Sequence, residues 1–182
     1  MNTIYFAGGC FWCVEHDLRN APGVTEVTSG YIGGTKEEAT YEQVAAHRTS
    51  HREAVAVSYD RAQTNFKKLV QFFLDHIDPT DQGGQFGDRG ESYKSAIYFA
   101  NDEEKEIAME ALKELNDSKV YTKPAFVDVL PVTPFYKAEE QHQNYAEKNP
   151  VAYAAYRAGS GREDFVNKTC QIREEKHIPW KE

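Results

Sequence analysis

The feature that most constrains this chain is a glycine turn that carries a cysteine, Gly8-Gly9-Cys10. The residues before it, Ile4 to Ala7, are mostly β-branched or aromatic, which predicts a short strand. Two consecutive glycines permit backbone angles that other residues avoid, so they end the strand. The mixed polar and apolar residues from Val14 to Asn20 predict a short amphipathic helix. The sequence therefore predicts a strand, a turn and a helix, with Cys10 at the helix N-terminus.

A cysteine in this position has reactive chemistry. Unpaired N–H groups and the helix dipole favour an anion there, so we expect the pKa of Cys10 to fall from about 8.5 to between roughly 3.5 and 7.5. Cys13 lies three residues on and shares a helix face with Cys10, so the two thiols are a candidate redox pair. The alternatives are two small buried hydrophobic side chains or half of a zinc site. Since there is no second CxxC or close Cys/His pair, zinc is the weaker alternative and no metal site is predicted.

Composition and charge limit the class of protein. At 182 residues the chain is expected to form a single domain, residues 1–182, without disulfide staples or structural metal. The 21 basic and 29 acidic residues give a net charge of −8 with no basic stripe, which argues against a nucleic acid partner. No targeting segment or membrane-spanning run is recognised, so we expect a cytoplasmic protein that does not bind membranes. Three cysteines without framework spacing fit such a reducing compartment.

Hydrophobic patterns along the chain predict both strands and helices. Strands are expected at 4–7, 24–32, 53–59, 94–100 and 126–132, with Phe135-Tyr136 beside the last one. Beyond the first helix, helices are expected at 66–74, 102–115 and 139–148, the last one stopped by Pro150. The glycine-rich stretch 78–91 is expected to be a long functional loop, and the tail from Gly159 on to have little regular structure.

The order of the first six elements is strand, helix, strand, strand, helix, strand. This is the order of the ferredoxin-like split βαβ core, a mostly antiparallel sheet packed with helices, here followed by a C-terminal extension. The predicted class is therefore α+β. A fold of this kind does not by itself specify a reaction.

Short motifs along the chain resemble the signature sequences of one enzyme family. In chain order they are Gly8-Gly9-Cys10-Phe11-Trp12, Gly30-Tyr31-Ile32-Gly33-Gly34, Thr40-Tyr41-Glu42-Gln43-Val44, His51-Arg52-Glu53-Ala54-Val55, Asp78-Pro79-Thr80, Gly87-Asp88-Arg89-Gly90, Tyr93-Lys94-Ser95-Ala96-Ile97-Tyr98 and Phe135-Tyr136-Lys137-Ala138-Glu139. The set resembles the peptide methionine sulfoxide reductase A family and covers most of the chain to about Pro150. The resemblance implies reduction of the S epimer of methionine sulfoxide, free or in proteins, in the repair of oxidised proteins and without a bound cofactor.

The resemblance also implies roles for particular residues. Cys10 would be the nucleophile, which becomes a sulfenic acid as methionine leaves. Phe11 and Trp12 would form an apolar wall that holds the substrate methyl group. Glu53 begins a strand of small apolar residues, so we expect it to be partly buried, with a raised pKa that keeps it protonated to donate toward the sulfoxide oxygen.

Three further polar residues match family positions. Tyr41 and Tyr93 would donate hydrogen bonds to the sulfoxide oxygen, where negative charge develops. Asp88 matches an acidic position that helps to bind the substrate. Without the resemblance, packing tyrosines and a turn-forming aspartate would be the ordinary interpretations. His142 is interpreted as a solvent-facing helical histidine without a catalytic role.

The sequence departs from the commonest family pattern at its second cysteine. Most relatives have glycine where Cys13 stands and use a cysteine in a flexible, glycine-rich tail to resolve the sulfenic acid. Here the tail cysteine, Cys170, has no glycine run around it. We therefore expect Cys13 to resolve Cys10 and thioredoxin to reduce their disulfide, with Cys170 as the alternative resolver. A dithiol oxidoreductase that depends on CxxC alone, or a non-catalytic module that binds methionine-like side chains or a metal, are the other hypotheses.

Overall fold

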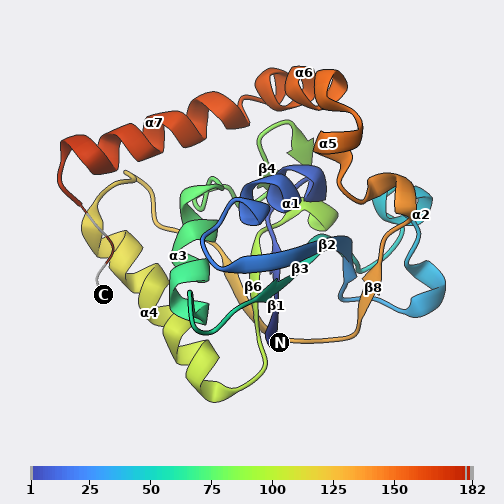
Figure 1. The fold of residues 1–182 in the computed structure, drawn as a ribbon, viewed down its shortest axis with the longest axis horizontal. Helices are drawn as coiled ribbons and strands as arrows, with labels where there is room; N and C mark the ends of the chain where they lie inside the picture. Colours follow the sequence, from blue (N-terminus) through green and yellow to red (C-terminus); the bar gives the residue numbers. More distant parts are fainter. Residues whose placement is uncertain (1, 179, 181–182) are drawn as a thin grey trace.

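The structure is a computed structural model that describes residues 2–178 and 180, and its centre is a six-stranded sheet (Figure 1). In spatial order the strands are β7-β6-β1-β3-β2-β8. Their bounds are Asn2–Ala7 for β1, Val24–Ile32 for β2, Arg52–Tyr59 for β3, Ala96–Phe99 for β6, Asp128–Pro131 for β7 and Phe135–Lys137 for β8. Neighbouring strands are antiparallel except β6 and β7, which run parallel. The predicted α+β fold with a mostly antiparallel sheet is therefore confirmed.

The two central strands are β1 and β3. Phe6 of β1 lies opposite Val55 of β3 and beside Ile97 of β6. Because successive side chains of a strand point to opposite faces, Phe6 enters the main core while Ala7 joins a smaller apolar cluster on the other face. The main face of the central strands is thus buried, the other face is buried in part, and Glu53 near the start of β3 is buried as well.

Three helices cover the main face of the sheet: α1 (Phe11–Arg19), α3 (Phe66–Asp75) and α4 (Asp102–Ser118). The apolar stripe of α3 packs inward, and the Phe73 ring stacks on Phe6 with 4.7 Å between centroids. Asn65 and Asn101 cap α3 and α4, each accepting a backbone hydrogen bond at 2.9 Å. Within the described residues, no helix is long and apolar enough to cross a membrane.

Short elements connect the strands of the sheet and the three helices. They are η1 (Lys36–Glu38), α2 (Tyr41–Ala45), β4 (Gly84–Gln85), β5 (Asp88–Arg89), η2 (Glu91–Tyr93), η3 (Glu140–His142) and α5 (Tyr145–Lys148). The stretch predicted as a long loop, 78–91, is largely irregular, but β4 and β5 pair within it as a small hairpin. An ion pair between Arg89 and Asp81 joins this hairpin to the segment before it. The loop that carries Asp88 is therefore an ordered one.

The C-terminal region differs most from the sequence prediction. Pro150 does not stop a helix there but begins α6 (Pro150–Ser160), since a proline at the first helical position sacrifices no hydrogen bond. The stretch 139–148 is not one helix, because Asn144 adopts a φ of 54° and separates η3 from α5. The tail predicted to be irregular forms α7 (Arg162–Glu175), which runs with α6 along one side of the molecule (Figure 1).

Candidate active site

The site is built on the turn between β1 and α1. Cys10 is the N-cap of α1, and its carbonyl accepts hydrogen bonds from the N–H groups of Cys13 at 3.1 Å and Val14 at 3.3 Å. Gly9 has a φ of 81°, and a Cβ at this position would lie 2.5 Å from the Cβ of Gln85. Only glycine fits such a conformation and such a close approach without strain. The predicted position of Cys10 at a helix N-terminus is confirmed.

Glu53 lies on β3 beside this helix start. The N–H of Phe11, one of the free N–H groups of the first helical turn, donates to Glu53 Oε2 at 2.9 Å. Glu53 is only 3% exposed, and burial raises its pKa to about 8 although the Phe11 hydrogen bond opposes the shift. The expected burial and raised pKa of this carboxyl group are confirmed, and most of it is protonated at neutral pH.

A cavity of about 90 Å³ lies over Cys10. It is lined by Cys10, Phe11, Trp12, Tyr41, Glu53, Asp88, Tyr93 and Tyr156. The structure thus brings together, around one small space, all of the residues predicted for the site except Cys13. That residue lies one turn along α1 and is completely buried.

Tyr156 is the one lining residue that the sequence analysis does not predict. It comes from α6, and its hydroxyl donates to the carboxylate of Asp88 and lies near the thiol of Cys10. The edge of its ring meets Trp12 at a centroid distance of 5.9 Å. The sequence does contain a signal for the helix α6 that carries Tyr156. Proline is a frequent first helical residue, and in a helix that begins at Pro150 the side chains of Tyr153 and Arg157 fall on one face.

The pKa values of the two thiols differ, and that of Cys10 shifts in the direction opposite to the prediction. Burial raises the pKa of Cys10 well above its ordinary value, and the hydrogen bond to Cys13 and the charge of Glu53 raise it further. The hydrogen bond from Cys10 lowers the pKa of Cys13 to about 7 against the effect of burial, and the positive charges of Arg162 and Arg157 assist. The predicted lowering of the Cys10 pKa is therefore wrong, since desolvation and a neighbouring acid outweigh the helix dipole. Cys13 is the more acidic thiol of the pair.

The tyrosines of the cavity are hydrogen-bond donors. Burial, with the nearby charge of Glu53, raises the pKa of both Tyr41 and Tyr93 above the ordinary phenol value. Burial and the neighbouring Cys10 do the same for Tyr156. All three phenols therefore keep their protons over the working range of pH, and each can donate to an oxygen in the cavity.

Aromatic rings form the wall beside Cys10. Phe11 is completely buried, and Trp12 stacks on Tyr145 with 3.8 Å between centroids and 8° between planes. His142 belongs to this wall, because its ring lies 4.3 Å from that of Tyr41 and its Nδ1 accepts from Trp12 Nε1 at 3.3 Å. The prediction of a solvent-facing histidine is wrong, since His142 is 5% exposed and burial lowers its pKa. It is thus a neutral part of the aromatic cluster.

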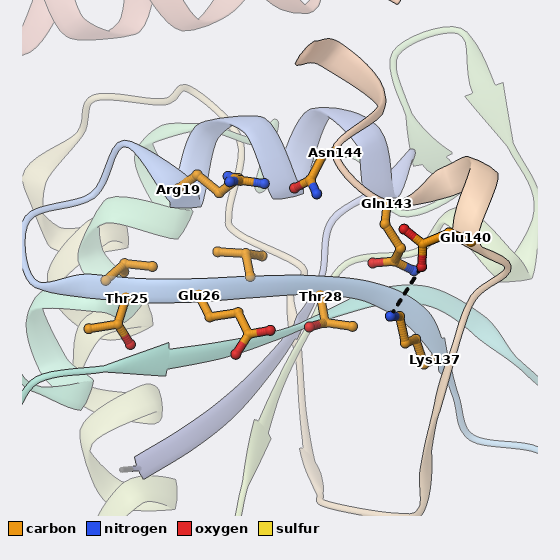
Figure 2. A pocket seen from close by; sticks show the side chains of 10 residues that line it. Arg19, Thr25, Glu26, Thr28, Lys137, Glu140, Gln143 and Asn144 are labelled. Carbon is orange, nitrogen blue, oxygen red and sulfur yellow. Dashed lines mark hydrogen bonds and ion pairs between the residues drawn. The ribbon is translucent and has the colours of Figure 1, made fainter. Parts of the chain in front are cut away.

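A larger hollow of about 320 Å³ lies away from the thiols, between the end of α1 and the first half of β2 (Figure 2). Arg19, Lys137 and Glu140 are among the residues that line it, and Lys137 pairs with Glu140 at 3.4 Å. It holds neither a thiol nor a buried acid, so we assign it no part in the chemistry. In the described part of the chain, no group of three or more His, Cys, Asp or Glu is arranged to hold a metal ion.

Cys10 and Cys13 lie one helical turn apart, and Cys10 shares a cavity with the protonated acid Glu53. This arrangement defines a thiol-dependent oxidoreductase site. A model of the family described as peptide methionine sulfoxide reductase matches residues 2–174. The chain is 48% identical over 168 residues to peptide methionine sulfoxide reductase MsrA of Bacillus velezensis, covering 92% of this chain and 95% of the relative. It is 46% identical over 162 residues to the protein of that name from Bacillus subtilis, covering 89% and 92%.

Two solved structures are also similar to this chain. The reduced form of Mxr1 from Saccharomyces cerevisiae matches with a TM-score of 0.77 and 28% identity, over 82% of this chain and 86% of that one. Methionine sulfoxide reductase A of Corynebacterium diphtheriae matches with a TM-score of 0.71 and 33% identity, over 82% and 75%. The chain therefore belongs to the peptide methionine sulfoxide reductase family, as the motifs indicated, and is an enzyme that reduces methionine sulfoxide.

Proposed function

We propose that this enzyme reduces the S epimer of methionine sulfoxide, free or in proteins, with Cys10 as the nucleophile. The observation that carries the proposal is the shared cavity, into which a cysteine, a mostly protonated acid and three tyrosines all face beside an aromatic wall. A soft nucleophile, a proton source and an apolar support for a methyl group are the three things that the reaction requires.

In the first step the sulfur of Cys10 attacks the sulfoxide sulfur and takes over its oxygen. The sulfur–oxygen bond of the substrate breaks, and the new bond makes Cys10 a sulfenic acid while methionine leaves. The substrate sulfur gains two electrons, and the sulfur of Cys10 loses them. One proton leaves the thiol and one enters the sulfenic acid, so one thiol and one sulfoxide give one sulfenic acid and one thioether.

Glu53 is the proton donor for this step. Because Glu53 and Cys10 both hold their protons at neutral pH, the sulfoxide oxygen is protonated as the thiol is deprotonated. The proton of Glu53 goes to the oxygen, and the carboxylate that remains takes up the thiol proton. Tyr41 and Tyr93 stabilise the developing negative charge on the oxygen with their hydroxyl groups. Asp88, held by Tyr156, helps to bind the substrate.

The selectivity for one epimer follows from the two unlike sides of the cavity. A methyl group placed against Phe11 and Trp12 leaves the oxygen to face Glu53 and the tyrosines. The other epimer exchanges these two positions, so that its oxygen faces apolar rings and loses its hydrogen bonds. An unpaired polar group costs roughly 1 to 3 kcal/mol, which disfavours the R epimer at the transition state.

In the second step Cys13 resolves the sulfenic acid. Its sulfur attacks that of Cys10, the disulfide forms, and the departing hydroxide leaves as water after taking a proton. The support for Cys13 is that it hydrogen-bonds to Cys10 and, with a pKa of about 7, is substantially ionised at neutral pH. The dithiol of thioredoxin then reduces the disulfide by exchange and is itself oxidised.

The test is to incubate the protein with racemic methionine sulfoxide and dithiothreitol and to identify the epimer left. We expect the S epimer to disappear and the R epimer to remain. Cys10→Ser is expected to abolish turnover, whereas a module that only binds methionine-like groups would keep its affinity. Consumption of neither epimer, with reduction of a protein disulfide instead, would point to a general dithiol oxidoreductase.

We further propose the finer structural and cellular assignments. Residues 1–182 are taken as a single catalytic domain, and its core as the ferredoxin-like split βαβ unit. The strand order β6-β1-β3-β2 with antiparallel neighbours and helices α1 and α3 supports that description. A cytoplasmic location suits the chemistry, since both thiols of the pair have to be reduced again after each turnover.

A further inference from the structure

We propose that Arg162, the first residue of α7, is a positioning residue that fixes the nucleophile turn and places an unneutralised positive charge beside Cys13. This charge makes Cys13 the thiol that attacks the sulfenic acid of Cys10. The proposal rests on the proposed resolving role of Cys13, but its test needs no turnover.

The contacts of Arg162 place it directly against the turn. Its Nη2 donates to the carbonyl oxygen of Gly8 at 2.6 Å, and its Nη1 donates to that of His76 at 3.0 Å. A Cβ at Gly9 would lie 3.0 Å from Nη2, so the guanidinium group lies directly beside the Gly8-Gly9 backbone. Its outer face stacks on the ring of Phe86, in the hairpin segment that carries Asp88, with 4.8 Å to the centroid. One side chain of the C-terminal layer, formed by α6 and α7, thus joins the nucleophile turn, the end of α3 and the hairpin segment.

The charge of Arg162 has no counter-ion. The residue is 1% exposed, and within the described residues no carboxylate forms an ion pair with it. Two other arginines of α6 and α7 whose side chains are 10% exposed do have partners, because Arg157 pairs with Asp17 at 2.9 Å and Arg173 with Asp75 at 2.7 Å. A buried cation bound only by carbonyl groups is costly, and a negative charge forming nearby reduces that cost.

Cys13 is the group positioned to carry this negative charge. The titratable groups that act on it are Cys10 and Asp17 of α1, Glu53 of β3, Tyr153 and Arg157 of α6, and Arg162 of α7. Asp17 neutralises Arg157, and both Asp17 and the ionised form of Glu53 oppose a thiolate. After the hydrogen bond from Cys10, the charge of Arg162 is the largest influence that lowers the pKa of Cys13. The net positive field at this thiol therefore comes from α7.

The consequence lies in the resolving step, where the nucleophile is a thiolate. If the pKa of Cys13 rose from about 7 to about 8, the thiolate fraction at pH 7 would fall roughly fivefold, and disulfide formation would slow in proportion. Because Arg162 also holds the turn that carries Cys10, loss of Arg162 is expected to slow both steps, and the second step more than the first.

The experiment titrates Cys13 in the reduced protein by the ultraviolet absorbance of its thiolate. Each protein is compared with its own Cys13→Ser counterpart, so that other groups cancel. We expect the midpoint to rise by about one pH unit in Arg162→Met and Arg162→Gln, and Arg162→Lys to stay near the parent, because a nearby opposite charge favours the ionised form. Arg173→Met is the matched control, since it removes the ion pair of α7 with Asp75 and is expected to leave the midpoint unchanged.

Two outcomes would overturn the proposal. Either the two neutral variants titrate like the parent, or Arg162→Lys moves as far as they do, which would assign the effect to lost packing. Two neutral variants are used so that poor folding of one leaves the comparison with Arg162→Lys intact. A failure of the proposed function appears separately, as absence of methionine formation by the parent protein.

Discussion

At the scale of single residues, the site depends on Glu53 and Cys10, each of which favours the protonated form of the other. Glu53 and Cys10 lie in one small cavity, and the charged form of either one disfavours the charged form of the other. Both are buried, which strengthens that mutual effect, since charges interact more strongly where water is excluded. Before substrate binds, both Glu53 and Cys10 are therefore protonated. A sulfoxide oxygen, which carries negative charge, is the group that can receive one of their protons.

The first prediction concerns Glu53→Gln. A glutamine keeps the shape of the side chain but has no proton to give, so we expect turnover to fall by about 10²-fold to 10⁴-fold. In the parent, burial raises the pKa of Glu53 to about 8, so the donor is present below pH 8 and is lost as the pH rises through this value. The parent rate should fall above about pH 8, and the variant should lack this dependence. Initial rates measured across pH test both points.

An unchanged rate in Glu53→Gln would contradict the assignment of Glu53 as the acid. The Asp88→Asn variant is the matched comparison for Glu53→Gln, because Asp88 lines the same cavity. We expect that change to weaken substrate binding and to keep a fall in rate at high pH, with the midpoint moved to a lower pH because the charge of Asp88 helps to raise the pKa of Glu53.

The second prediction concerns stability. Burial raises the pKa of Glu53 in the folded protein, so the folded state holds a proton that the unfolded state loses above about pH 4. The parent should therefore lose stability as the pH rises from about 4 to about 8, by an amount on the order of 5 kcal/mol, while Glu53→Gln should not. Urea unfolding at a series of pH values measures the difference. A constant difference between the two proteins would show that this carboxyl group ionises normally.

Glu139 provides a control of opposite sign. Although burial opposes it, the N–H of Tyr41 and the hydroxyl of Tyr31 hold the pKa of Glu139 below its ordinary value. The stability that it contributes is present above the ordinary carboxyl pKa and is lost as the pH falls through the lowered one. Glu139→Gln should therefore cost stability at neutral pH, and this cost should shrink as the pH is lowered into the acid range.

At the scale of elements, the turn between β1 and α1 is the most constrained segment. In Gly9→Ala the new methyl group meets Gln85 in a left-handed backbone conformation, so we expect a loss of about 2 to 4 kcal/mol in the free energy of unfolding. Gly159→Ala is the matched control, since Gly159 lies in α6 with no atom within 4 Å of its added Cβ. That change should stabilise by up to about 1 kcal/mol, because alanine favours a helix. Equal effects at the two positions would contradict this account.

The comparison of sequence and structure separates two kinds of element. Strands and helices with their own apolar pattern were predicted closely, such as Val24–Ile32 and the helix that begins at Phe66, because local burial determines them. The sequence pattern does not predict α7 because this helix has few apolar residues, and it docks by contacts such as the ion pair of Arg173 with Asp75 and the cation–π contact of Arg162 with Phe86. Such contacts join residues far apart in the sequence, and no periodicity reveals them.

The same reason explains what was missed in the site. The family motifs predict Cys10, Glu53 and the other cavity residues except Tyr156. Tyr156 and His142 reach the site from the C-terminal third, where tertiary packing decides which side chains point inward. The reversed acidity of the two thiols also needs the structure, because desolvation and the charges of α6 and α7 cannot be read from spacing.

At the scale of the whole molecule, the C-terminal layer is attached to the core by polar contacts. Asp75 of α3 binds both Arg173 of α7, at 2.7 Å, and the ring N–H of Trp180, also at 2.7 Å. Arg162 binds the nucleophile turn at the other end of α7. Both ends of this helix are therefore held, and Cys170 is carried on a fixed helix and not on a mobile tail.

This arrangement supports the proposal that Cys13, and not Cys170, is the resolving cysteine. Cys170 lies near Asp75, Glu174 and Arg173, whereas Cys10 hydrogen-bonds to Cys13. For Cys170 to reach Cys10, α7 would have to leave the core and break its buried arginine contacts, and each broken buried pair costs roughly 3 to 5 kcal/mol. Cys13 needs no such movement.

The last prediction follows from this difference. Cys170→Ser should keep the parental rate with thioredoxin, because its thiol takes no part in the cycle. Cys13→Ser should release methionine once per enzyme molecule and then stop, since Cys10 remains as a sulfenic acid that a sulfenic acid trap captures. Peptide mass mapping of the oxidised parent should give a Cys10–Cys13 disulfide. A Cys10–Cys170 disulfide, with turnover lost in Cys170→Ser, would instead show that α7 detaches in every cycle.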